Sequence, residues 1–157
     1  MAEPNIGLDE NARVAVAEAL TRVLADSYAL YLKTHGYHWN VVGPQFPVLH
    51  ALFEEQYREL WAALDVIAER VRALGRFAPA SGAEFAKLAA IESTEKTPPP
   101  ADQMVKNLLE GHETLIRRAR EALETADDAD DAASEDLLTQ RIQTHEKTAW
   151  MLRAMIE

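Results

Sequence analysis

The strongest constraint in this sequence is the helical spacing of its apolar residues, which is clearest between residues 46 and 74. Within this segment apolar side chains recur every three or four residues, as they do on one face of an α-helix: Phe46, Leu49, Phe53, Tyr57, Leu60, Leu64, Ile67 and Val71. Gly43 and Pro44 separate the segment from what precedes it, and Pro47 suits a first helical turn. Gly75 ends the pattern. The segment therefore predicts one long amphipathic helix.

The same spacing recurs in three other parts of the chain. Apolar residues follow it over residues 13–40, 104–122 and 138–156, so we expect four long helices. The Ser-Gly-Ala-Glu sequence at residues 81–84 has the form of a helix-capping box and predicts a short helix between the second and third. No alternating strand pattern competes with this assignment. The predicted fold class is all-α, a ferritin-like four-helix bundle with a short extra helix in its long connection.

The length and charge of the chain narrow the class of protein. With 157 residues it is the size of one domain, residues 1–157, in which we expect residues 1–12 to form a short tail. Lys and Arg total 16 against 26 Asp and Glu, a net charge of −10 that repels nucleic acid and anionic membranes. The sequence shows neither a signal-peptide pattern nor the ~18 unbroken apolar residues of a membrane helix. We therefore expect a soluble, cytoplasmic protein.

Possible metal ligands share one face of the helix predicted for residues 46–74. They are His50, Glu54, Asp65 and Glu69, the last three lying 4, 15 and 19 residues beyond the first. At ~100° per residue their side chains point in directions of roughly 0°, 40°, 60° and 100°. A solvated polar stripe is the ordinary explanation for one such residue, but clustering favours a site. Because the chain has no cysteine, its metal ligands must be histidines and carboxylates, which suit iron, manganese or zinc.

The length of this helix prevents one metal ion from contacting the whole set. At ~1.5 Å rise per residue, Asp65 lies about 22 Å from His50. Two antiparallel copies of the helix that cross near Glu59 and Leu60 would bring His50 of one copy to Asp65 of the other. An intrasubunit di-iron site needs Glu-x-x-His pairs instead, and no glutamate precedes a histidine by three residues. The spacing therefore predicts two equivalent intersubunit sites.

Several short motifs lie between residues 35 and 70: His35-Gly-Tyr-His38-Trp39-Asn40, Gly43, Phe46, Leu49-His50 and Asp65-x-x-Ala68-Glu69-Arg70. With these motifs the chain resembles the mini-ferritins called Dps, the DNA-binding proteins from starved cells. The resemblance implies that His38 and His50 come from one subunit, whereas Asp65 and Glu69 come from its two-fold partner. Glu54 occupies a position that is also acidic in the family.

The resemblance also implies an activity and an assembly. Members of the family form a hollow dodecamer that acts as a ferroxidase: it oxidises Fe(II), preferably with hydrogen peroxide, and stores the Fe(III) as a mineral. Both reactants of Fenton chemistry are consumed, which protects DNA. Iron is the expected metal, with zinc or manganese as substitutes. Two other hypotheses stay open: a non-catalytic nucleoid-binding or structural cage with a zinc-bridged dimer interface, and a helical interaction module without metal.

Other aromatic residues and histidines near these motifs have more than one interpretation. By resemblance, Trp39 is an aromatic close to the site that intercepts stray oxidising equivalents, and the alternative is interface packing. We expect Trp61 to serve mainly in packing. His35 could assist a second metal, but a hydrogen bond at the interface is the preferred role. His145 continues the apolar series of its helix and predicts a core histidine, whereas we expect His112 at the surface.

An acidic stretch covers residues 124–136, with seven carboxylates and no basic residue. One interpretation is a solvated loop that also places favourable negative charge at the start of the last helix. The other, implied by the resemblance, is a cation entry path, because acidic residues at this place line three-fold pores into the cage. Asp131 and Asp136 are the candidate pore residues.

The chain differs from the DNA-binding members of this family in its terminal sequences. Members that bind DNA often use a terminal extension rich in Lys and Arg. Residues 1–12 contain Glu3, Asp9 and Glu10 and no basic residue, and the chain stops at Glu157. Because phosphate binding depends on many basic contacts, we predict weak or absent direct DNA binding.

Overall fold

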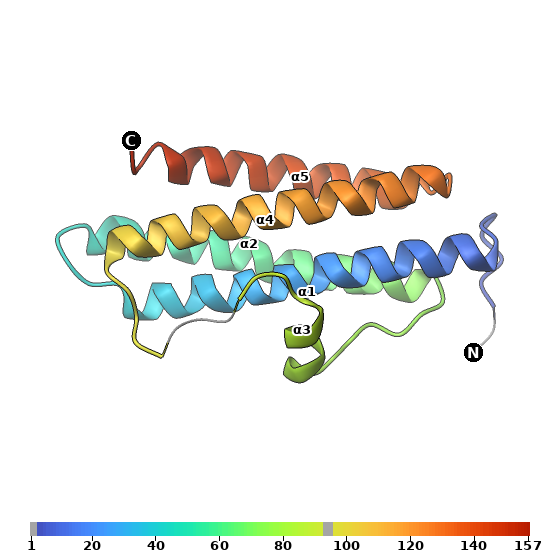
Figure 1. Ribbon diagram of the computed structural model, residues 1–157, viewed down its shortest axis with the longest axis horizontal. Helices are drawn as coiled ribbons and strands as arrows, with labels where there is room; N and C mark the ends of the chain where they lie inside the picture. The colour runs from blue at the N-terminus through green and yellow to red at the C-terminus, as the bar shows by residue number, and fades with distance from the viewer. Residues whose placement is uncertain (1–2, 93–95) are drawn as a thin grey trace.

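The computed structural model of the chain describes residues 3–92 and 96–157. Its helices, in chain order, are α1 (Glu10–Asn40), α2 (Phe46–Ala73), α3 (Gly82–Leu88), α4 (Ala101–Asp128) and α5 (Ala132–Arg153). Figure 1 shows the four long helices side by side, with α1 packed against α2 and α4, α5 packed against α4, and short α3 outside the bundle beside α1. The predicted ferritin-like four-helix bundle with its short extra helix is confirmed.

The connection from α2 to α4 runs back along the outside of the bundle, so that α4 starts at the same end as α2 (Figure 1). A buried carboxylate holds the connection in place. Asp26 of α1 accepts hydrogen bonds from the backbone N–H of Ala90 at 2.6 Å and of Ile91 at 3.0 Å, and from Arg118 Nε of α4 at 3.0 Å. A buried charge requires such partners. Asp26 therefore joins the crossover to two helices of the bundle.

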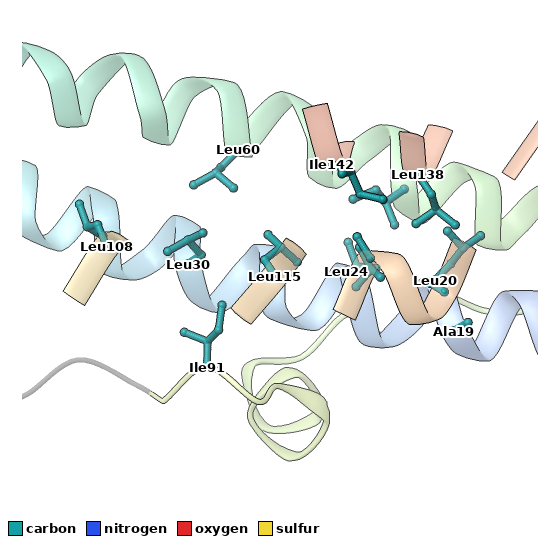
Figure 2. Close-up of a cluster of buried hydrophobic side chains, with 14 of the residues drawn as sticks. Ala19, Leu20, Leu24, Leu30, Leu60, Ile91, Leu108, Leu115, Leu138 and Ile142 are labelled. Atoms are coloured by element: carbon teal, nitrogen blue, oxygen red, sulfur yellow. The ribbon is translucent and has the colours of Figure 1, made fainter. Parts of the chain in front are cut away.

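A continuous apolar core lies between the four long helices. Figure 2 shows its members from different helices pointing toward one another, among them Leu20, Leu24, Leu30, Leu60, Leu108, Leu115, Leu138 and Ile142. Replacing one such leucine by alanine typically costs about 2–5 kcal/mol. Gly111 of α4 leaves room for Leu30 of α1, because a Cβ at Gly111 would lie 2.7 Å from Leu30 Cδ1.

Local capping explains where several helices begin. Asp9 accepts a hydrogen bond from the Ala12 N–H at 2.9 Å, which starts α1 at Glu10 and makes the tail shorter than the expected residues 1–12. Ser81 and Glu84 form the predicted capping box of α3, with the Glu84 N–H 3.3 Å from Ser81 Oγ. Among the described residues, we find no helix with the length and apolar character needed to span a membrane.

The acidic stretch is mostly helical and not a loop, but it does place negative charge at the start of the last helix as expected, with Asp131 as the N-cap and Glu135 in the first turn of α5. Residues 124–128 form the last turn of α4, and α5 starts at Ala132, earlier than the apolar pattern predicts. Asp131 caps the new helix by accepting a hydrogen bond from the Ser134 N–H at 3.2 Å. Because of this cap, α5 includes acidic residues that do not follow the apolar helical spacing.

Candidate metal centre

Two histidines from different helices face each other near one end of the bundle. His38 lies in the last turn of α1 and His50 near the start of α2, joined by the short connection at residues 41–45. His38 Nδ1 is 2.8 Å from the carbonyl oxygen of His50, and His50 Nδ1 is 2.8 Å from the carbonyl oxygen of His38. Their rings stack, with the centroids 3.8 Å apart and an angle of 20° between the ring planes. Each histidine thus orients the other.

This exchange of hydrogen bonds determines which ring nitrogens are free. A carbonyl oxygen only accepts, so each Nδ1 must carry the hydrogen and donate it. Each Nε2 of the neutral imidazole then keeps its lone pair. Metal-bound histidines are typically held in this way, with the second ring nitrogen donating to a carbonyl oxygen. His38 is 9% exposed and His50 is half-buried, so both rings are held in fixed orientations near the surface.

Glu54 lies one helical turn after His50, but a neighbouring arginine engages its carboxylate. Arg58 donates from Nε and Nη2 to Glu54 Oε1 at 2.9 and 2.6 Å. Both side chains of this ion pair are exposed, and such pairs contribute only about 0–1 kcal/mol. A metal ion would therefore need little free energy to displace Arg58 from Glu54.

Asp65 and Glu69 are exposed side chains farther along α2. The single chain does not bring them to His38 and His50, since Asp65 and Glu69 lie about four and about five turns beyond His50 on the same helix. Across residues 3–92 and 96–157, no three histidine or carboxylate side chains are grouped to hold a metal ion. The intersubunit ligand set of His38, His50, Asp65 and Glu69 stays a prediction.

An aromatic cluster of Tyr31, His35, Trp39 and Tyr57 adjoins the histidine pair. The His35 ring stacks on the Tyr57 ring, with the centroids 3.8 Å apart and an angle of 12° between the ring planes. The His35 centroid also lies 4.1 Å from the centroid of the Trp39 ring. The Tyr31 hydroxyl is 3.1 Å from His35 Nδ1, which is a hydrogen bond within the chain, and the hydrogen bond expected for His35 at the interface stays a prediction. Burial, together with the nearby His38 and Arg58, lowers the pKa of His35.

Two tryptophans on the same side of the chain are largely exposed. Trp39 and Trp61 are both 62% exposed, and Val66 beside Asp65 is 55% exposed. Exposed large apolar side chains of this kind mark surfaces that other molecules cover. The single chain therefore leaves the neighbourhood of Asp65 uncovered.

His112 is buried, which corrects the expectation that it lies at the surface. It is 2% exposed, and its Nδ1 lies 3.0 Å from Nδ1 of His145, a core histidine as predicted. Arg141 contacts His145 Nε2 at 2.9 Å and pairs with Glu59 of α2. Because Arg141 can only donate, His145 Nε2 must accept, and His145 Nδ1 then donates to His112.

Both buried histidines are held in the uncharged form. Desolvation, with a smaller contribution from Arg141, lowers the pKa of His112 to about 3. Desolvation is also the largest cause that holds the pKa of His145 well below its usual range, followed by His112 and Arg141. The helical spacing alone did not reveal this network, because it joins residues of three different helices.

The two candidate pore residues lie in different environments. Asp131 is 3% exposed and accepts hydrogen bonds from Arg70 Nη2 and the Ser134 hydroxyl, both at 2.6 Å. Burial raises the pKa of Asp131, but these partners outweigh it, and the net shift is downward. Both of its carboxylate oxygens are already engaged by these partners within the chain, and its pore role stays a prediction. Asp136 is exposed and accepts from Gln140 at 2.7 Å, and its pore role stays a prediction.

Comparison with known proteins agrees with this architecture. Residues 17–157 match the family described as the ferritin-like domain, and the chain is therefore a ferritin-like protein. It is 36% identical to DNA protection during starvation protein 2 of Bacillus anthracis over 141 residues, which is 90% of this chain and 96% of that one. The chain belongs to the Dps family of mini-ferritins.

Two further similarities cover nearly the whole chain. An uncharacterised low temperature-induced protein of a Nostoc species is 46% identical over 154 residues, 98% of this chain and 86% of the relative. The crystal structure of a Dps protein from Vibrio cholerae O1, described as a ferritin-like diiron-carboxylate protein, matches with a TM-score of 0.94. That match has 34% identity and covers 100% of this chain and 98% of the other.

Proposed function

We propose that this protein is a ferroxidase and iron store whose oxidation site forms between two copies of the chain. The observation that carries the proposal is the reciprocal hydrogen bonding of His38 and His50, which leaves each Nε2 free to bind a metal ion. Two imidazoles alone leave most coordination positions open. Carboxylates from elsewhere must complete the site.

The missing ligands are Asp65 and Glu69 of a second copy. Antiparallel packing of α2 against its symmetry mate places the carboxylate end of one helix beside the histidine end of the other. The exposed tryptophans Trp39 and Trp61 support this arrangement, because the same contact would cover them. Glu54 joins the site once the metal ion displaces Arg58. The full assembly is a dodecameric cage with its mineral inside.

The reaction follows from holding Fe(II) as the substrate next to hydrogen peroxide. Two ferrous ions each give up one electron, and one peroxide molecule takes both electrons and two protons to form two water molecules. Because both electrons arrive at one site, no hydroxyl radical is released. The ligands supply position and charge, whereas iron and peroxide supply the chemistry. The ferric product hydrolyses and accumulates inside the cage, so DNA is protected without being bound.

Substitutions at the two ends of α2 test the proposal. His50→Ala and Asp65→Ala should each abolish fast oxidation of Fe(II) by peroxide, measured by the growth of ferric absorbance. Glu55→Ala, an exposed position on α2, is the matched control and should oxidise iron like the wild type. Size-exclusion chromatography must show that all variants assemble equally.

Mixed cages distinguish an intersubunit site from one within a single chain. Co-assembly of the His50→Ala and Asp65→Ala chains should restore part of the activity, since some interfaces then pair two intact ends. Failure to recover activity in mixed cages would contradict the shared site. If the wild type binds zinc tightly but oxidises no iron above the buffer rate, these residues only fasten a structural cage.

A further inference from the structure

Arg58 lies on the face of α2 that carries the proposed ligands. It is eight residues beyond His50, so at ~100° per residue its side chain points in a direction of roughly 80°, between those of Asp65 and Glu69. It also directly precedes Glu59, near the point where the two copies of α2 cross in the proposed dimer. A positive charge therefore lies on the same face as the carboxylates of the proposed site.

The guanidinium of Arg58 has two partners within its own chain. Its Nε and Nη2 both donate to Oε1 of Glu54, at 2.9 and 2.6 Å. The central carbon of the guanidinium also lies 5.9 Å from the centroid of the Tyr57 ring, within the ~6 Å over which an aromatic face attracts a cation. The Arg58 side chain is 68% exposed. The guanidinium can thus leave Glu54 and remain beside Tyr57 in contact with water.

The proposed dimer places a second carboxylate next to Glu54. The crossing point of the two helices lies midway between Glu54 and Asp65, so antiparallel copies bring Glu54 of one chain opposite Asp65 of the other. Without a metal ion these like charges repel each other across the interface, and such juxtapositions weaken association. Arg58 reduces this repulsion by pairing with Glu54. The metal-free interface needs a cation, and the chain itself supplies one.

We propose that Arg58 occupies Glu54 in place of a metal ion in the metal-free protein and releases it when a divalent cation binds. This inference rests on the proposed intersubunit metal site. Arg58 positions a ligand and does not itself contact the metal ion. Binding is an exchange, in which the two positive charges of the metal ion replace the single positive charge of Arg58 at Glu54.

This exchange has two effects of opposite sign. In the metal-free protein Arg58 stabilises the interface between the two copies, because it offsets the repulsion between their carboxylates. In the same protein Arg58 weakens metal binding, because the cation must first displace it from Glu54. An exposed ion pair is weak, so this cost is small. The cage therefore stays assembled when metal is scarce, and its sites still accept a metal ion.

Binding of Zn²⁺ to the metal-free, assembled protein tests this inference, since zinc takes the same ligand types and is not oxidised. Titration calorimetry should show that Arg58→Gln binds Zn²⁺ about two- to fivefold more tightly than the wild type, as expected for loss of an exposed ion pair. The metal-free Arg58→Gln cage should dissociate at a lower urea concentration, measured by light scattering, and added Zn²⁺ should restore its stability. Both differences should shrink at about 1 M salt, which screens exposed charges.

Three further variants separate the possible causes. Arg58→Lys keeps the positive charge and should resemble the wild type in both measurements. Arg117→Gln removes an exposed charge from α4 and should change neither. A His50→Ala protein that binds Zn²⁺ like the wild type would overturn the intersubunit site itself.

If His50→Ala loses Zn²⁺ binding, the site holds and three results would overturn the role of Arg58 alone. One is wild-type behaviour of Arg58→Gln in both measurements. Another is weaker Zn²⁺ binding together with weaker assembly in Arg58→Gln, which would show a merely structural role. The third is an Arg58→Lys protein that behaves like Arg58→Gln, because the positive charge would then not be the cause.

Discussion

The buried histidine pair of the bundle core predicts a loss of stability in mild acid. The pKa of His112 falls from 6.5 to about 3 on folding, so the unfolded chain binds a proton between these values and the folded chain does not. His112 therefore contributes its full stability above pH 6.5, and that contribution is lost as the pH falls toward 3. The pKa of His145 is also lowered on folding, so its contribution to stability is likewise lost as the pH falls.

The magnitude follows from proton linkage. Each pH unit in this window costs about 1.4 kcal/mol of unfolding free energy through His112, and the full shift of His112 corresponds to about 5 kcal/mol. This is a large share of the roughly 5–15 kcal/mol that stabilises an ordinary domain. We therefore expect the urea midpoint of metal-free protein to fall steeply between about pH 6.5 and about pH 5, a range above the usual carboxylate pKa values.

His112→Gln tests the assignment of this pH dependence. Glutamine does not titrate, so the variant should show a markedly shallower fall in stability over the same range, whatever its stability at neutral pH. Circular dichroism during urea unfolding measures the stability at each pH. The protein concentration is kept the same throughout, because assembly contributes to stability. An equal pH dependence in wild type and variant would refute the reasoning, since another group would then be taking up the proton.

Two more predictions concern Asp131 and DNA. Asp131→Ala should destabilise the protein by about 3–5 kcal/mol in urea unfolding, because it removes a helix cap and leaves the largely buried Arg70 without its carboxylate partner. Asp136→Ala should change stability by no more than about 0.5 kcal/mol, as an exposed position does. The iron-free protein should give no gel shift with DNA at physiological salt, and a clear shifted band would show that other basic residues bind phosphate.

The helix positions were largely predictable because helical periodicity is a local property. Apolar residues three and four apart must share a face for any amphipathic helix to pack, so the segment at residues 46–74 became α2 with nearly the predicted bounds. The capping box of α3 is equally local. The start of α5 was predicted too late because its first turn is acidic and is stabilised by the Asp131 cap instead of by apolar packing.

The candidate ligands were also accessible from the sequence, but their orientation was not. Spacing placed His50 and Asp65 on one face of a helix, and the resemblance added His38. The hydrogen bonds that orient His38 and His50 depend on how α1 and α2 approach each other across the loop that joins them. No repeat or spacing encodes that approach.

The sequence by itself determined the set of helices, because helix formation depends on neighbours within one or two helical turns. It also determined directly which residue types are available for chemistry. Only the tertiary structure decided that His112 is a buried partner of His145, and that Asp131 pairs with Arg70, 61 residues away. The physical reason is that the rotation and register of each helix follow from packing of the whole core. The same packing decides which polar groups lose water and must find a partner.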